Sequence, residues 1–165
     1  MREIKAIPIT NENFRPYGAF ASMSAPSGNC FPGMDSTFYP DSVMLSVSGR
    51  EQIAFSPLTV NKSAEMLVTK SEYHDHTGEG IYFIDDDAVI HVAPPSNRQI
   101  VPSKTEAFIV PQGTIVKLNV GVWHLSPLPL HNNVLHLMII MPERVYANDC
   151  VVCEFPESEY IKIVL

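Results

Sequence analysis

The stretch His74-Asp75-His76-Thr77-Gly78-Glu79 holds two histidines and a carboxylate, and a third histidine, His124, follows Trp123 much later in the chain. Two histidines at positions i and i+2 of an extended segment share one face of a β-strand. A distant histidine can join them in a metal site only if the sheet curls and brings the two segments together. The stretch therefore predicts a small β-barrel with a polar pocket in its mouth.

The length and composition suit one ordered domain. The chain has 165 residues, of which 45% are hydrophobic and 18% are charged. This is enough to bury a core, and it predicts a single domain over residues 1–165. The 14 prolines, together with few long helical patterns, favour an all-β chain with many corners.

The charge and the apolar runs exclude several partners. The formal net charge is −7 and no cluster of Lys or Arg offsets it, so a nucleic acid would be repelled. Residues 1–10 are polar and broken by Pro8, unlike a signal peptide. The longest apolar run, Val134–Met141, is far shorter than the roughly 18 residues that cross a bilayer. We therefore expect a cytoplasmic protein with no nucleic-acid or membrane partner.

The three cysteines, Cys30, Cys150 and Cys153, indicate reduced thiols because their number is odd and no export signal accompanies them. Cys150 and Cys153 have a C-x-x-C spacing, but a zinc site needs four ligands and no second pair exists. We interpret them as small apolar residues of a strand.

Short elements follow one another along the chain. Thr10, followed by Asn13 and Phe14, predicts the N-cap of one short helix that ends at Gly18. Residues 24–42 are rich in Ser, Pro, Gly and Asp and predict a long loop. The rest is typical of an antiparallel sandwich or barrel. The predicted strands are Val43–Val47, Gln52–Phe55, Glu65–Lys70, Gly80–Ile84, Ala88–Ala93, Ala107–Val110, Thr114–Leu118, Val134–Met141 and Cys150–Phe155. The segment Glu157–Leu165 is a strand or a short helix.

Two segments resemble the two motifs of the cupin superfamily. The first motif is His-x-His followed by Glu. The second is Gly-x5-Pro-x-Gly-x2-His, which matches Gly113, Gly121 and His124, with Asn119 in the proline position. Glu79 stands one residue early, so a bulge or turn must absorb the extra step before its side chain can face the histidines. The resemblance implies an all-β, cupin-like double-stranded β-helix (jelly-roll) barrel.

The candidate metal ligands are His74, His76, Glu79 and His124. Three imidazoles and a carboxylate suit Zn, Mn, Ni or Fe and leave positions open for a substrate. The alternative is that residues 74–79 form a solvated turn and that His124 is a structural residue beside Trp123.

Two further polar residues stand in predicted strands. His91 either faces the barrel interior or lies on the wetter side of its strand. Lys117 is flanked by Val116 and Leu118. It either holds a substrate carboxylate or extends to the surface along its own stem.

Several segments taken together resemble the ureidoglycolate lyase (ureidoglycolate hydrolase) family, in the family's order. His74, Glu79 and the apolar residues after them resemble its His…Gln-Ala-Phe-Ile-Pro segment. The chain departs from the family at Leu125, where a second histidine is common, and at Leu118-Asn119, where Tyr-His is common. The other matching pieces are Ile7–Thr10 with Phe14, Tyr17 and Gly18, Ala107–Ile109, Val122-Trp123-His124, and Asn148-Asp149-Cys150.

This resemblance implies a carbon–nitrogen lyase of the amidine-lyase type, which splits ureidoglycolate into glyoxylate and urea in purine (allantoin) breakdown. It implies that His74 and His124 act at the site, as metal ligands or as acid and base, with Lys117 as a partner for the substrate carboxylate. Cupin barrels also serve as sugar isomerases or epimerases and as non-catalytic barrels that bind a small ligand, so both alternatives stay open, as does a structural barrel without a site. Leu125 in place of the second histidine would be expected if a catalytic acid had been lost. Cupins commonly pair through sheet edges, so we expect a homodimer.

Overall fold

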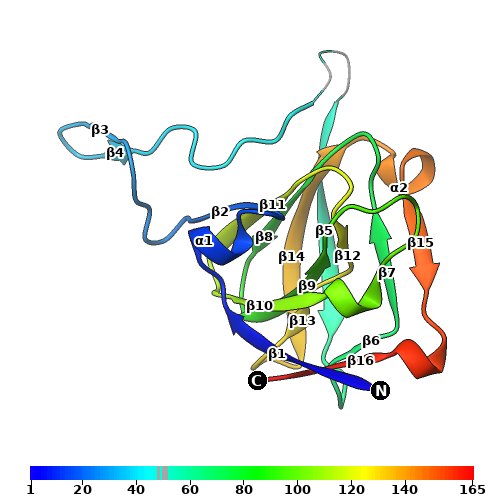
Figure 1. The fold of residues 1–165 in the computed structure, drawn as a ribbon. Helices are drawn as coiled ribbons and strands as arrows, with labels where there is room; N and C mark the ends of the chain where they lie inside the picture. Colours follow the sequence, from blue (N-terminus) through cyan, green and yellow to red (C-terminus); the bar gives the residue numbers. More distant parts are fainter. Residues whose placement is uncertain (48, 50–51) are drawn as a thin grey trace.

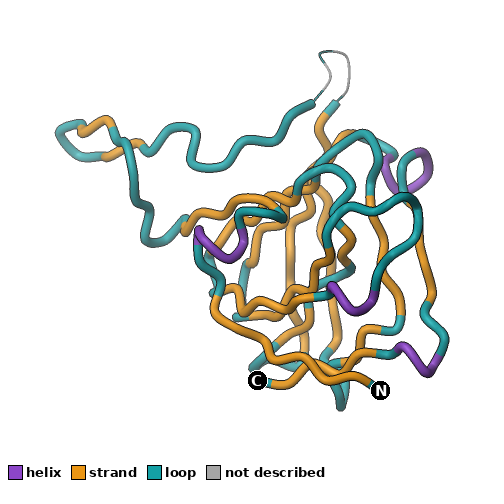
Figure 2. Tube along the Cα trace, viewed as in Figure 1, coloured by secondary structure: helices purple, strands orange, loops and turns teal. Residues whose placement is uncertain are grey.

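A computed structural model describes residues 1–47, 49 and 52–165 of the chain. Within these residues two curled sheets face each other and form a barrel (Figure 1). Figure 2 shows that strands make up most of this barrel and that the helices are single short turns at its margins. The prediction of an all-β barrel with one short N-terminal helix is confirmed, and a second short helix, which was not predicted, lies near the C-terminus.

The first sheet is named here in the order of its hydrogen-bonded neighbours. It contains β15 (Val151–Glu154), β7 (Lys70–Tyr73), β12 (Trp123–His124), β9 (Ala88–Ala93), β10 (Glu106–Val110), β1 (Arg2–Pro8), β16 (Ile161–Val164) and β6 (Leu67–Val68), with β13 (Leu128–Pro129) paired to β9. Strand β1 pairs in parallel with both β10 and β16, while the other pairs are antiparallel.

The second sheet is antiparallel. Its strands, in order, are β2 (Gly18–Ser22), β11 (Thr114–Leu118), β8 (Glu79–Phe83), β14 (Val134–Pro142) and β5 (Ile53–Asn61). The remaining elements are the small strands β3 (Phe31–Pro32) and β4 (Thr37–Phe38), the helices α1 (Asn11–Phe14) and α2 (Val145–Asn148), and the 3-10 turns η1 (Pro102–Lys104) and η2 (Glu157–Glu159).

The core lies between the two sheets because alternate residues of each strand point inward. Ile81 and Phe83 of β8 join Val116 of β11 and Phe108 of β10 in one buried apolar cluster. The intervening residues of the first sheet form a second cluster, which contains Trp123. The barrel interior is therefore filled by apolar side chains, and the polar interior residues described below are confined to one end.

The N-terminal helix begins where the sequence predicts, but it ends at Phe14 and not at Gly18, which opens β2. The hydroxyl of Thr10 accepts from the backbone N–H of Asn13, and the Asn13 side-chain oxygen accepts from the N–H of Thr10. This reciprocal pair caps the helix N-terminus. The fully buried Phe14 then anchors α1 to the core.

The observed strands agree with the predicted ones over most of the chain and differ at particular places. Strands β9 and β11 have the predicted bounds. Residues 43–47 are not a strand, and Glu157–Leu165 contains both η2 and strand β16. Strands β1, β2, β12 and β13 were not predicted.

Residues 23–47 form an arm whose middle part, with β3 and β4, stands away from the barrel (Figure 1), while Leu45 and Ser46 lie against the barrel beside Gly78 and Lys117. It begins after β2 and leads toward β5, so it joins the two edge strands of the second sheet. Near its tip, β3 and β4 make a small hairpin in which Phe31 is opposite Phe38. The predicted loop over residues 24–42 corresponds to most of this arm.

Candidate metal centre

Three side chains meet inside one end of the barrel. His74 follows β7, Glu79 opens β8, and His124 ends β12. His124 lies opposite Val92 of β9, and Val92 belongs to the core between the sheets. The side chain of His124 therefore points into the barrel interior. All three side chains are at least nine-tenths buried.

The three polar groups converge on one oxygen atom. Oε2 of Glu79 lies 3.1 Å from Nε2 of His74 and 2.9 Å from Nε2 of His124. One ligand atom from each residue lies within 4.8 Å of the others, which is close enough for a single metal ion to bind all three. The prediction that the sheet brings imidazoles from two distant segments to one cavity therefore agrees with the structure for His74 and His124.

The hydrogen bonds of the two Nδ1 atoms determine whether each Nε2 atom has a lone pair or a hydrogen. Nδ1 of His74 lies 2.6 Å from the carbonyl oxygen of Asp149, and Nδ1 of His124 lies 2.8 Å from that of Val122. A carbonyl oxygen only accepts, so each Nδ1 carries a hydrogen and donates it. In a neutral imidazole Nε2 then has a lone pair, which here faces a carboxylate oxygen that also has only lone pairs.

A positive charge is therefore required between the two rings and Glu79. Protons on the nitrogen atoms or one metal ion would supply it, and histidines whose Nδ1–H is held by a carbonyl are oriented as metal ligands usually are. The donor set thus fits a divalent metal ion bound by His74, Glu79 and His124.

The ionisation of the cluster follows the same electrostatics. Burial raises the pKa of Glu79, but the charge of His124 and the hydrogen bonds of both histidines outweigh it and bring the pKa to about 2. Burial lowers the pKa of His124, but the carboxylate of Glu79 outweighs this and the pKa is raised. In the metal-free protein Glu79 is therefore an anion and His124 its cationic partner.

A tight turn carries the chain from His74 to Glu79. The Asp149 carboxylate accepts from the backbone N–H groups of Asp75 and His76 at 2.8 and 2.9 Å. The carbonyl of His74 accepts from the N–H of Gly121 at 2.8 Å, and Gly121 has φ +78°, which suits glycine. The turn accommodates a spacing that is one residue shorter than in the motif, so Glu79 reaches the interior.

Two predicted site residues are not brought to this cluster. The side chain of His76 is 85% exposed and its Nδ1 pairs with Asp149 at 3.0 Å. The i, i+2 argument fails for His76 because β7 ends at Tyr73 and the chain is already turning. Lys117 lies between two inward residues of β11, Val116 and Leu118, so it points outward, where its Nζ donates to Asn119 at 2.6 Å.

A cavity of about 190 Å³ adjoins the cluster. Glu72 and Cys150 line it, and the Cys150 thiol donates to Oε2 of Glu72 at 3.2 Å. Burial and the neighbouring Glu72 carboxylate raise the pKa of Cys150 to about 12, so the group is a neutral thiol. The remaining lining residues are Leu58, Ser126, Pro127, Ile139, Met141 and Tyr146.

Sequence reasoning missed Glu72 and Ser126, although a signal for both was present. Glu72 precedes His74 by two residues and Ser126 follows His124 by two, so strand alternation places each on the face of its histidine. Glu72 also lies directly opposite His124 in the pairing of β7 with β12. For Asp149 and Cys150 the signal was the family-like segment Asn148-Asp149-Cys150.

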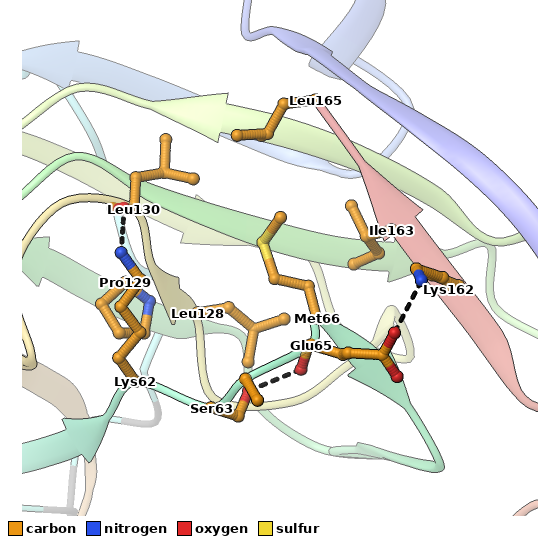
Figure 3. Close-up of a pocket in the computed structure, with 11 residues that line it drawn as sticks. Lys62, Ser63, Glu65, Met66, Leu128, Pro129, Leu130, Lys162, Ile163 and Leu165 are labelled. Atoms are coloured by element: carbon orange, nitrogen blue, oxygen red, sulfur yellow. Dashed lines mark hydrogen bonds and ion pairs between the residues drawn. The ribbon is translucent and has the colours of Figure 1, made fainter.

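A larger cavity, of about 300 Å³, lies beside the C-terminal strand (Figure 3). Its two lysines already have partners within the chain. Lys62 donates to the carbonyl of Leu130, and Lys162 pairs with Glu65, both at 2.6 Å. No histidine lines it among the described residues, so we place the candidate site at the smaller cavity.

His91 is buried in β9 and lies on the face opposite to that of Ile90 and Val92. Its Nε2 has no hydrogen-bond partner among the described residues. Burial and the nearby charge of His124 lower the pKa of His91 to about 3, so it is neutral. It does not line the cavity next to the cluster.

Comparisons with known proteins point to one family. The family model for ureidoglycolate lyase matches residues 1–162. No curated protein matches the chain. Among solved structures, oxalate decarboxylase from Bacillus subtilis at pH 4.6 is 18% identical, with a TM-score of 0.42 over 55% of this chain and 21% of that one. A structure from work on the Mn(II) centres of the same enzyme is 17% identical, with a TM-score of 0.45 over 66% of this chain and 27% of that one.

The described residues contain no helix that is both long and apolar enough to span a bilayer.

Proposed function

Because the chain belongs to the ureidoglycolate lyase family, we propose that it is a lyase that cleaves ureidoglycolate into glyoxylate and urea. The chain spans only 21% to 27% of the solved structures named above, so the proposal depends on the family match and on the chemistry of the cavity.

The reaction needs one proton removed and one delivered. The central carbon of the substrate carries a hydroxyl, a carboxylate and a ureido nitrogen. As the hydroxyl O–H bond breaks, its electrons form the carbonyl of glyoxylate, and the C–N bond breaks with its electron pair on nitrogen. That nitrogen takes up a proton and leaves as urea. The site must therefore bind an anion and move one proton. The reaction needs no strong nucleophile, so the main task of the site is to position the substrate next to the group that transfers the proton.

The observation that carries the proposal is the source of positive charge in the cavity. Among the described residues, those that line the cavity include no lysine or arginine, yet the substrate is a carboxylate. The cluster of His74, Glu79 and His124 requires a cation, and it borders the cavity directly. These three residues would hold a divalent metal ion. Such an ion, when bound, supplies a Lewis acid that binds the carboxylate and favours the alkoxide.

The proton is assigned to Glu72. Its carboxylate lies in the same cavity and accepts a hydrogen bond from the Cys150 thiol. The described structure shows no hydrogen bond between Glu72 and the histidine cluster. We propose that Glu72 accepts the hydroxyl proton and returns it to the departing nitrogen. The hydroxyl of Ser126 is available for the ureido group, and Ile139 and Met141 form an apolar wall that limits access of water.

The setting of the enzyme is also a proposal. The proposed substrate belongs to purine (allantoin) breakdown, and we propose a cytoplasmic location. We retain Zn, Mn, Ni and Fe as the candidate metals, and we propose one domain over residues 1–165.

The test combines urea release from ureidoglycolate with elemental analysis of the purified protein. We expect urea and glyoxylate in equal amounts, and about one transition-metal ion per chain. Glu72→Gln should abolish urea release and leave the metal content unchanged. Binding of ureidoglycolate without turnover would reject the enzyme in favour of a binding protein, and turnover that persists in Glu72→Gln would reject the role of Glu72.

A further inference from the structure

The cavity beside the histidine cluster has two sides of different character. The second sheet supplies the apolar side, which consists of Leu58 of β5 with Ile139 and Met141 of β14. Most of the polar groups come instead from strands of the first sheet or from residues next to them. These are Glu72, His74, His124, Ser126 and Cys150.

The strand register places the apolar side next to the proposed metal ligands. Ile140 of β14 pairs with Gly80 of β8, so Met141 is the cross-strand neighbour of Glu79 and shares its face of the sheet. Leu58 and Ile139 pack against the buried core. Strand β14 is paired on both edges, with β5 and β8, so its backbone groups are used within the sheet. Among the described residues, the apolar side therefore offers a ligand only aliphatic groups and a thioether.

Ureidoglycolate makes poor use of this apolar side. Its carboxylate and hydroxyl belong at the cluster and Glu72, so the ureido group is the part that extends across the cavity. The hydroxyl of Ser126 can donate to the ureido carbonyl, but the terminal amino group has two N–H bonds of its own. Against aliphatic side chains, these N–H bonds lose water without gaining an acceptor, which is unfavourable. An alkyl group in place of one hydrogen gains free energy from burial against the same side chains.

We propose that the enzyme also cleaves ureidoglycolates whose terminal nitrogen carries an alkyl group, and that the apolar side binds this group. The inference rests on the proposed function and uses the same bonds. The hydroxyl O–H and the C–N bond to the central carbon break, and the carbonyl of glyoxylate forms. Glu72 carries the proton to the departing nitrogen, and an N-alkylurea leaves in place of urea. Tyr146 lines the cavity and is 79% exposed, so the cavity opens to solvent beside it and leaves room for a longer chain.

The experiment compares ureidoglycolate with its terminal N-butyl derivative, with glyoxylate release as the signal. Calorimetry on oxalurate and N-butyl oxalurate measures binding without turnover, because these analogues have a carbonyl in place of the carbinol carbon and cannot release glyoxylate. The test variant, Met141→Gln, puts an amide of similar size on the apolar side. The matched control, Met138→Gln, makes the same change on the same strand. Met138 points away from the cavity, because Leu137 and Ile139 on either side of it point into the core.

We expect the wild-type protein to cleave both compounds, and to bind N-butyl oxalurate at least about tenfold more tightly than oxalurate, since each buried methylene contributes about three- to fourfold. Met141→Gln should lower this ratio at least about threefold, and Met138→Gln should not change it. A ratio of one or less would overturn the proposal, and so would a ratio that Met141→Gln leaves unchanged. Glyoxylate release from ureidoglycolate alone refutes only the alkyl activity, whereas no release from either compound refutes the lyase itself.

Discussion

Replacing Glu79 by glutamine tests the assignment of protons in the histidine cluster. In the metal-free protein, Oε2 of Glu79 accepts from both Nε2 atoms, and each Nδ1 donates to a carbonyl. A glutamine amide has two N–H donors. If its nitrogen takes the place of Oε2, its two N–H groups donate to the two Nε2 atoms, and each ring keeps the bond from its Nδ1 to a carbonyl. Glu79→Gln thus exchanges two charged bonds for two neutral ones.

The magnitudes separate this variant from the alanine variant. Removal of one partner from a buried charged pair costs about 3–5 kcal/mol, and we expect this loss for Glu79→Ala. For Glu79→Gln both bonds persist as neutral bonds of about 1 kcal/mol each, so the loss should stay below about 1.5 kcal/mol. Both variants should lose the metal ion, because an amide is a poor ligand compared with a carboxylate.

Urea denaturation in the presence of a chelator measures the free energy of unfolding, with the fluorescence of the fully buried Trp123 as the signal. The pH dependence gives an independent check. Because the pKa of His124 is raised in the folded protein, its contribution is fully present below its ordinary value of 6.5 and is lost as pH rises through the raised value. Glu79→Gln should remove this loss. If Glu79→Gln unfolds as easily as Glu79→Ala, the two Nε2 atoms do not have the lone pairs that we assign to them.

Three further predictions use other residues. His124→Ala should abolish urea release while cooperative unfolding persists, and turnover in this variant would reject the site. His76→Ala should keep the metal content and at least about half of the activity of the wild-type protein, since its side chain is exposed and its pair with Asp149 is screened by solvent; a variant that loses the metal of the wild-type protein would contradict the position of His76 outside the cluster. The pKa of His91 is lowered to about 3 in the folded protein, so below pH 6.5 the unfolded chain binds a proton that the folded chain does not. The free energy of unfolding of the wild-type protein should therefore decrease by about 1.4 kcal/mol per pH unit as pH falls from 6.5 toward 3. His91→Leu should lack this decrease in denaturant titrations between these values, and an unchanged slope would show that His91 is not its source.

The sequence predicted the cluster where the spacing itself carried the geometry. His74, Glu79 and His124 follow from two short motifs at strand ends. The prediction for His76 failed because the i, i+2 alternation of a strand was applied to residues that lie in a turn. Strand alternation already held the answer for Lys117, because Val116 and Leu118 are core residues and the residue between them must face outward.

Elements that depend on distant partners were the hardest to predict. Strand β1 is held by parallel pairing with β10 and β16, which lie much later in the chain. Residues 43–47 have the composition of a strand and Leu45 lies beside Gly78, yet in the described structure they pair with no strand and remain part of the arm that joins β2 to β5. The position of Glu72 two residues before His74 indicated its face of the strand, but its place opposite His124 comes from the pairing of β7 with β12, which the local sequence does not specify.

The hydrogen bonds between Asp149 and residues 74–76 have a consequence for biosynthesis. All three ligands are translated before residue 149, but the carbonyl that orients the His74 ring and the carboxylate that ties down the following turn arrive only with the last part of the polypeptide. A nascent chain that already contains every ligand therefore lacks the prearranged geometry. Loading of the metal should be a late, post-translational event, and C-terminal truncation before residue 149 should produce a protein that binds metal poorly although it keeps every ligand.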